Sequence, residues 1–250
     1  MTLGIVAATL AAVFLGATLQ RLSGTGVGLV VAPVLALLIG PALGVFMANA
    51  TTMLSGTIIM LAVLKDVDWR RYLIFLPAGI LGAIPAALLV RELSAAWLNI
   101  VIGLVVLAAL ALTFGTPRVP HIRSGWLAAA GGAAGAFLNT SAGVAAPGMV
   151  IYAKFARWPQ RSFAATMQPT FATFGALSVG SKLAVGAMAI SQLPPWWIFP
   201  VIFAAVGLGI IAGGRLARLV TAEAARRLAI SLAGAGAAVA LVRGLVMLAG

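Results

Sequence analysis

Apolar runs of about 20 residues recur from one end of the chain to the other, and a membrane-spanning helix needs a run of that length. Of all residues, 63% are apolar and only 8% are charged, whereas about 25% are charged in a soluble domain. A membrane β-barrel would show alternating segments of about ten residues, and these runs do not alternate. The sequence therefore predicts an all-α polytopic membrane protein.

The net charge of +12 lies in short segments between the apolar runs. Basic loops of this kind follow the positive-inside rule, so we expect a lipid bilayer and no nucleic acid as partner. The chain has no cysteine, one histidine and four carboxylates, which are too few ligands for a structural metal centre. No nucleotide-binding or zinc-protease motif occurs. We therefore expect no cofactor, no metal and no enzymatic activity.

Two apolar segments are interrupted by short polar stretches that contain glycine. The first, Gln20–Gly28, holds an arginine and three alternating glycines and is followed by Pro33. The second, Asn139–Gly143, is followed by Pro147. Irregular backbone inside a bilayer is tolerated only where protein or a water-filled cavity surrounds it. A pair of such breaks at matching positions in two halves is typical of a transporter substrate site.

The breaks divide the chain into two predicted repeats, joined by a linker over residues 116–124. The first repeat, residues 1–115, comprises a broken hairpin over 3–39 and transmembrane helices over 42–64, 72–90 and 95–114. The second repeat, residues 125–250, comprises a hairpin over 126–155 and transmembrane helices over 162–190, 196–212 and 229–248. Residues 1–4 lack the basic start of a signal peptide, so we expect the first run to belong to the fold.

The length of the first broken segment predicts that the two repeats are inverted. Residues 3–39 would form a helix of about 55 Å, which is too long for one crossing of a ~30 Å bilayer. The segment must re-enter or cross twice, two alternatives that both return it to its starting side. Three further crossings then leave the second repeat upside down relative to the first. The breaks also align with one another, Gln20 with Asn139 and Gly24 with Gly143.

The basic residues support this topology because most of them gather on one side. If the broken segments crossed only once, the loops would divide far more evenly. The positive-inside rule then places both termini outside a bacterial-type plasma membrane and the basic loops in the cytoplasm. The residues on the basic side are Lys65, Arg70, Arg71, Arg118, Arg123, Lys154, Arg157, Arg161, Arg215, Arg218, Arg226 and Arg227.

We expect the chemistry where the two hairpin tips meet near the membrane midplane. Each tip begins a returning helix, whose free N–H groups and positive dipole end suit an anion. Arg21 lies inside the first break with no obvious carboxylate partner, so a transported anion is its expected counter-ion. The alternative is that Arg21 snorkels to an interface or binds backbone carbonyls. Lys182 and Arg243 lie near span ends, where snorkelling is the default.

Polar residues on the spans after the breaks complete the candidate site, either as substrate ligands or as hydrogen bonds between helices. The candidate substrate-binding residues are Arg21, Gln20, Ser23, Gly24, Thr25, Gly26, Asn49, Thr52, Asn139, Thr140, Ser141, Gly143 and Gln168.

Three stretches resemble the TauE/SafE family of sulfite exporters: residues 23–28 with Pro33, residues 48–52, and the second copy Ser141, Gly143 and Pro147. The resemblance covers essentially the whole chain. It implies secondary transport of small sulfur-containing anions such as sulfite or organosulfonates, and we expect export by alternating access. An anion channel of the same architecture and a membrane assembly subunit without transport are the alternatives. Whether the protein forms a homodimer is left open.

Overall fold

The computed structural model describes residues 2–24, 27–115, 120–122 and 124–249. Across these ranges the chain forms α-helices and short 3-10 turns, with no strand. Six helices are long and apolar enough, by length and composition, to cross a membrane. The protein is therefore an all-α polytopic membrane protein, as the sequence predicts.

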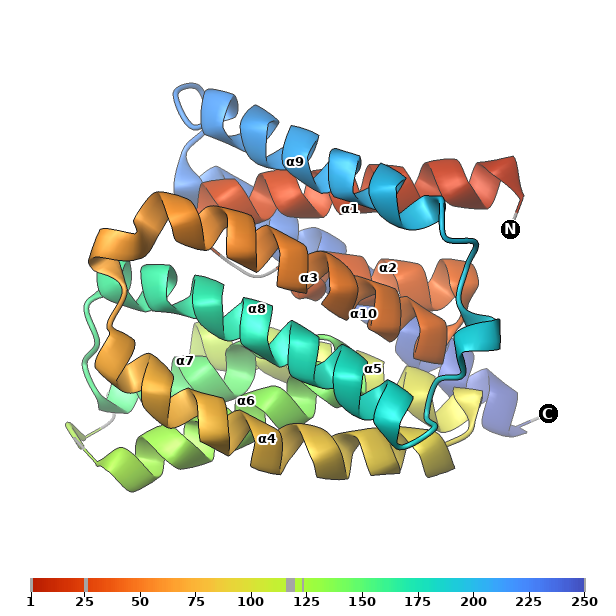
Figure 1. The fold of residues 1–250 in the computed structure, drawn as a ribbon, viewed down its shortest axis with the longest axis horizontal. Coiled ribbons are helices and arrows are strands. Elements are labelled where there is room, and N and C mark those ends of the chain that lie inside the picture. Colours follow the sequence, from red (N-terminus) through yellow and green to blue (C-terminus); the bar gives the residue numbers. More distant parts are fainter. Residues whose placement is uncertain (1, 25–26, 116–119, 123, 250) are drawn as a thin grey trace.

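The helices of the first half lie roughly along the long axis of the molecule (Figure 1). A 21-residue α1 is followed by a 12-residue α2, which turns back. Three long helices complete this half. Its elements are α1 (Leu3–Ser23), α2 (Gly28–Ile39), α3 (Pro41–Val63), η1 (Leu64–Asp66), α4 (Trp69–Glu92) and α5 (Ala95–Gly115).

The second half again begins with a longer and a shorter helix that lie on either side of a break. The long helices that follow differ from the predicted spans at their ends. The helix α8 ends at Ala184, before the predicted residue 190, and Gly186 just after it takes a positive φ of 74°. The helix α10 begins at Ala222, before the predicted residue 229, and the Thr221 hydroxyl caps its start. The elements are α6 (Gly125–Ala142), α7 (Ala146–Phe155), α8 (Gln160–Ala184), η2 (Ile190–Gln192), α9 (Ile198–Leu216) and α10 (Ala222–Ala249).

Both breaks are narrower than the sequence predicts, and both are set by one glycine. The helix continues through Gln20 to Ser23 in the first half and through Asn139 to Ala142 in the second. Gly24 then takes φ 71° and Gly143 takes φ 77°, in the left-handed region that glycine adopts most readily. The N–H of each glycine donates to a carbonyl four residues earlier, at 2.8 Å in both cases. Thr25 and Gly26 lie outside the described residues.

The two ends of the helical bundle, at the right and left of Figure 1, differ in the charge of the residues in their connections. One end, here the terminal end, holds the start of α1, the end of α10 and the turn between α2 and α3. The opposite end, here the basic end, holds the α3–α4, α7–α8 and α9–α10 connections, with basic residues in each. Arg118 and Arg123 lie outside the described residues.

Glycines allow α3 and α8 to pack closely in the middle of the bundle. A Cβ on Gly56 would lie 2.7 Å from the carbonyl oxygen of Gln168, and a Cβ on Gly175 would lie 2.6 Å from that of Asn49. Small residues at a helix crossing permit such backbone contact in membranes. Gly175 follows Gly56 by 119 positions, and Gln168 follows Asn49 by the same 119. The two contacts therefore repeat each other across the crossing.

Candidate functional site

Two pairs of buried amide side chains tie the helices before the breaks to the central crossing of α3 and α8. Gln20 Nε2 on α1 donates to Gln168 Oε1 on α8 at 2.9 Å. Asn139 Nδ2 on α6 donates to Asn49 Oδ1 on α3 at 2.8 Å. In each pair the residue four positions before the break glycine is the donor. The candidate residues Gln20, Asn49, Asn139 and Gln168 are therefore brought together two by two.

The Asn49 side-chain amide forms hydrogen bonds to more helices than does its counterpart Gln168 on α8. Its Nδ2 also donates to the Asn139 carbonyl at 3.0 Å and to Ser178 Oγ on α8 at 2.8 Å. Among the described residues, Gln168 Nε2 donates within its own helix, to the Ala164 carbonyl at 3.0 Å. Gln20 Oε1 is buried and finds no hydrogen-bond partner among the described residues. The first pair thus has a spare acceptor, whereas the second is closely tied to α8.

The two hairpins touch where their breaks meet. A Cβ on Gly28, the first residue of α2, would collide with the carbonyl oxygen of Gly143. Beside this contact lies a cavity of about 10 Å³, whose walls include Gly28, Thr52, Asn139 and Gly143. That is room for about one water molecule. The hairpin tips are therefore closed on each other in this conformation.

A larger cavity of about 370 Å³ adjoins the small one and lies toward the basic end. The two share Leu29, Ala146 and Phe171 as walls. Ser23 and Gly24 of the first break also line the large cavity. Residues from the end of α7, the start of α8 and the start of α10 form its outer part. The large cavity thus extends from the basic end to the first break.

Three cationic side chains line the large cavity: Lys154, Arg157 and Arg226. No acidic side chain is among the described residues that line it. Lys154 Nζ donates to the Leu112 carbonyl at 3.2 Å, which fixes the ammonium at the wall. Clefts lined by one sign of charge raise the local concentration of the opposite ion. This cavity is therefore electropositive.

Arg157 occupies a backbone position that normally takes glycine. Its φ is 44°, the single positive φ of a non-glycine residue in the described chain. The turn after α7 requires it, because Arg157 N donates to Lys154 O and Trp158 N donates to Ala153 O. A left-handed residue with a Cβ costs about 1–2 kcal/mol. Arginine holds this strained position beside the cavity.

Trp158 forms the aromatic wall next to Arg157. Its indole Nε1 donates to Ser162 Oγ at 3.2 Å, and the guanidinium carbon of Arg71 lies 4.4 Å from the ring centroid. Arg71 is in turn held by Asp68 at 3.2 Å. A cation over an indole face is attracted by the ring quadrupole. These contacts order the cavity wall at the basic end.

Arg21 lies away from both cavities. It is exposed, and its stem packs against Gly213 of α9, where an added Cβ would meet Arg21 Cβ at 2.8 Å. Because α1 stays helical to Ser23, successive side chains point about 100° apart, and Arg21 cannot share the direction of Gln20. The structure does not bring Arg21 to the hairpin tips, so its predicted contact with substrate is unsupported by this arrangement.

The hydroxyl candidates mostly bond to their own helices. Ser23, Thr52 and Ser141 each reach a backbone carbonyl four residues earlier, at 2.7 or 2.8 Å. Thr140 Oγ1 is buried and finds no partner among the described residues. Thr52 lines the small cavity and Ser23 the large one. A hydroxyl bonded in this way still has an oxygen that can accept from a ligand.

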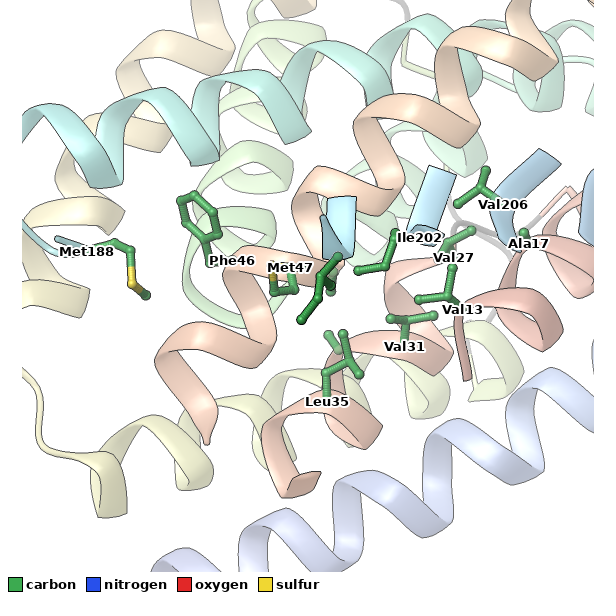
Figure 2. Close-up of a cluster of buried hydrophobic side chains, with 13 residues drawn as sticks. Val13, Ala17, Val27, Val31, Leu35, Phe46, Met47, Met188, Ile202 and Val206 are labelled. Atoms are coloured by element: carbon green, nitrogen blue, oxygen red, sulfur yellow. The ribbon is translucent and has the colours of Figure 1, made fainter. Parts of the chain in front are cut away.

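Apolar side chains fill the bundle between α1, α2, α3 and α9 (Figure 2). Val13, Val31 and Leu35 meet Ile202 and Val206 in this cluster, and Phe46, Met47 and Met188 extend it. Met188 belongs to the α8–α9 connection at the terminal end. The bundle is therefore packed with apolar side chains toward the terminal end, whereas the cationic cavity lies toward the basic end.

All four acidic side chains of the sequence are engaged in ion pairs with nearby arginines. Within the described residues there is also no group of three or more potential metal ligands. The acids therefore leave the cations of the cavity uncompensated. The pairs are Asp66 with Arg161, Asp68 with Arg71, Glu92 with Arg91 and Glu223 with Arg227.

Sequence reasoning missed the cavity cations and Ser178. From the sequence alone, Lys154, Arg157 and Arg226 indicate only the orientation of the chain, because a basic residue near a span end usually marks the cytoplasmic side. The signal for Arg157 was its place at a helix end, where glycine is common. Arg243 is also more than a snorkelling residue, since its Nη1 donates to the Leu37 carbonyl near the end of α2 at 2.9 Å.

A family model described as Sulfite exporter TauE/SafE matches residues 9–241, which is nearly the whole chain. No curated protein and no solved structure gives a match.

Proposed function

The chain belongs to the sulfite exporter TauE/SafE family, and we propose that it is a secondary transporter of small sulfur-containing anions such as sulfite or organosulfonates. The observation that supports this function best is the cationic cavity that leads to the paired breaks. Three cations and no carboxylate line it among the described residues, so its electrostatics favour an anion.

The cavity also fits the size and chemistry of such a substrate. A volume of about 370 Å³ accommodates a small oxyanion with part of its hydration shell. Arg157 and Arg226 carry guanidinium forks that bind oxyanions through two parallel hydrogen bonds. Trp158, Phe163 and Phe171 provide apolar wall for the organic part of a sulfonate. The anion then passes from this cavity to the amide-lined centre.

We propose that the two halves are inverted repeats and that transport occurs by alternating access. The pair Gln20–Gln168 and the pair Asn139–Asn49 are related by a shift of 119 positions in both members. The glycine contacts of α3 and α8 repeat with the same shift. Equivalent contacts in inverted halves allow two conformations of similar energy, in which the halves exchange roles.

The positions of the charges suggest the orientation and the direction of transport. The positive-inside rule places the basic end in the cytoplasm and both termini outside a bacterial-type plasma membrane. The cavity at the basic end then collects anions from the cytoplasm, and opening of the terminal end releases them outside. Because the four carboxylates lie in surface ion pairs, a carboxylate proton relay has no residue to use. Uniport, exchange or a proton carried by the substrate are the mechanisms that fit.

Thermal unfolding of the purified protein with a panel of anions tests the binding site. Sulfite, sulfoacetate, taurine, thiosulfate, sulfate and acetate are compared for wild type, Arg226→Ala and the exposed control Arg218→Ala. A bound ligand raises the apparent stability by mass action. We expect one sulfur anion to raise the Tm of wild type and of the control, and to lose most of that effect in Arg226→Ala. Equal shifts in all three proteins would move the site elsewhere, and no shift with any anion would contradict the proposed substrate class.

A further inference from the structure

Lys182, near the end of α8, is a buried basic residue, and the part of the chain that the structure describes gives its side chain no partner. The residue is 1% exposed, and its Nζ finds no hydrogen-bond partner among the described residues. The chain after α8 folds back over this turn, since Met188 N donates to Lys182 O at 3.2 Å. Met188 itself belongs to the apolar cluster in Figure 2. The expectation from the sequence that Lys182 snorkels to the surface is therefore wrong.

The chain offers Lys182 no acidic side chain. All four carboxylates are in ion pairs with arginines. Glu92 lies at the same terminal end as Lys182, but it is bound by Arg91, whose Nη1 also donates to the Val185 carbonyl. Ionisable residues inside a membrane usually lie along a substrate or ion pathway. Lys182 therefore has no free side-chain carboxylate within the chain as a counter-ion, so a counter-ion has to come from outside the chain.

Lys182 continues the polar line that begins at the amide pairs. Ser178 lies one helical turn before it, on the same face of α8, and accepts a hydrogen bond from Asn49 Nδ2 at 2.8 Å. Asn49 is bonded to Asn139 at the second break. The line therefore runs from the break through Asn49 and Ser178 to Lys182, toward the terminal end.

The other half of the molecule has no equivalent of Lys182. The position 119 residues earlier is Val63, at the end of α3. The first half therefore packs at the crossing of α3 and α8 with an apolar residue at this position, so the packing itself does not need a lysine. The lysine is an addition to one half, placed on the side of the amide pairs that faces away from the cationic cavity.

We propose that Lys182 forms a second anion-binding site, which holds the transported anion in the half of the pathway between the amide pairs and the terminal end. This inference rests on the proposed anion transport. When the apolar cluster at the terminal end separates, the ammonium becomes the first cation that an anion meets beyond Asn49 and Ser178. The cavity cations and Lys182 then serve opposite ends of the same route.

Flux measurements in proteoliposomes test this role with three lysine variants. Radiolabelled sulfite uptake is compared for wild type, Lys182→Met, Lys182→Cys and the exposed control Lys65→Met. We expect both Lys182 variants to be at least tenfold slower than wild type and the control to equal wild type. Thermal unfolding is measured on the same samples. Lys182→Met is expected to unfold at the same or a higher temperature, because removing an unpaired buried polar group does not destabilise a fold.

Chemical restoration of the charge provides the decisive comparison. The natural chain contains no cysteine, so Lys182→Cys has a single thiol. Reaction with 2-aminoethyl methanethiosulfonate restores an ammonium at nearly the length of lysine, whereas methyl methanethiosulfonate adds a neutral group. We expect the first reagent to restore at least half of the lost flux and the second to restore none. Mass spectrometry confirms that both have reacted.

Three outcomes would overturn the inference. The first is wild-type flux in Lys182→Met. The second is a slow Lys182→Met protein whose Tm is clearly lowered, since the lysine would then be structural. The third is a fully modified Lys182→Cys protein that neither reagent restores. If wild type itself moves no anion, the proposed function fails first, and that result is distinct from a loss confined to the Lys182 variants.

Discussion

Asn139, on the last turn of α6, donates its side-chain amide to Asn49 Oδ1 on α3 at 2.8 Å, inside the bundle. Gln20 and Gln168, each 119 positions away from one of them, make the same bond between α1 and α8. Each pair joins the helix before a break to one of the two helices that cross at the centre. A movement of either hairpin relative to that crossing must therefore break or carry along an amide pair.

The amide pairs predict matched losses of stability in the two halves. Asn139→Leu leaves Asn49 Oδ1 buried without its donor, and Gln20→Leu does the same to Gln168 Oε1. An unsatisfied buried polar group costs about 1–3 kcal/mol. We expect both variants to lose stability in that range in denaturant unfolding. Thr57→Ala, whose hydroxyl is exposed and bonds only its own helix, is the control and should change little. A loss in one half alone would argue against their equivalence.

Replacing Arg157 by glycine is predicted to raise the stability of the protein and to slow transport. Arg157→Gly relieves a positive φ of 44°, so the free energy of unfolding should rise by up to about 1 kcal/mol. The same change removes a cation from the cavity wall, and anion flux should fall several-fold. Arg157→Lys keeps the charge and should keep more flux than the glycine variant. Equal flux in wild type and Arg157→Gly would show that this cation does not contribute to substrate capture.

The contact between the hairpin tips leaves no room for a side chain. In Gly28→Ala the new Cβ would collide with the Gly143 carbonyl, which is backbone and cannot rotate away. Overpacking of this kind costs about 1–3 kcal/mol, and the separated tips should also slow transport. Gly180→Ala on α8 meets nothing within 4 Å and serves as the control. A Gly28→Ala protein with normal Tm and normal flux would contradict the contact.

Arg21 and Arg226 are predicted to differ although both are arginines at the basic end. Arg21 is exposed and lies outside both cavities, whereas Arg226 lines the large one. Arg21→Ala should leave sulfite flux within about twofold of wild type, and Arg226→Ala should raise the half-saturating concentration several-fold. Concentration-dependent flux measures both. The reverse order of effects would return Arg21 to the substrate site.

How much of this arrangement is visible in the sequence depends on whether the signal is local. Glycine at 24 and 143 marks the breaks because a left-handed backbone is a property of one residue. The side that Arg21 faces is different, since it depends on where α1 ends and on α9, nearly two hundred residues later. The residue pattern therefore places the breaks to within a few positions but leaves open which polar side chains turn toward them.

The basic residues show the same limit of what can be predicted from the sequence. Basic residues near span ends predict the orientation of the chain through their number, whatever their partners. The same residues line a cavity only if the ends of α7, α8 and α10 converge, which no linear pattern reveals. Lys182 illustrates the opposite error: a lysine near a span end usually reaches the surface, but the returning loop after α8 encloses this one.

The central claim is that the protein carries anions by alternating access, and counterflow tests it most directly. Proteoliposomes loaded with a high concentration of unlabelled sulfite are diluted into a trace of radiolabelled sulfite. We predict transient accumulation of label above equilibrium, saturable with external sulfite and absent from liposomes without protein, because a carrier exchanges substrate one for one across the membrane. Flux that equilibrates without overshoot and does not saturate would indicate a channel, and no flux at all would contradict transport of this anion.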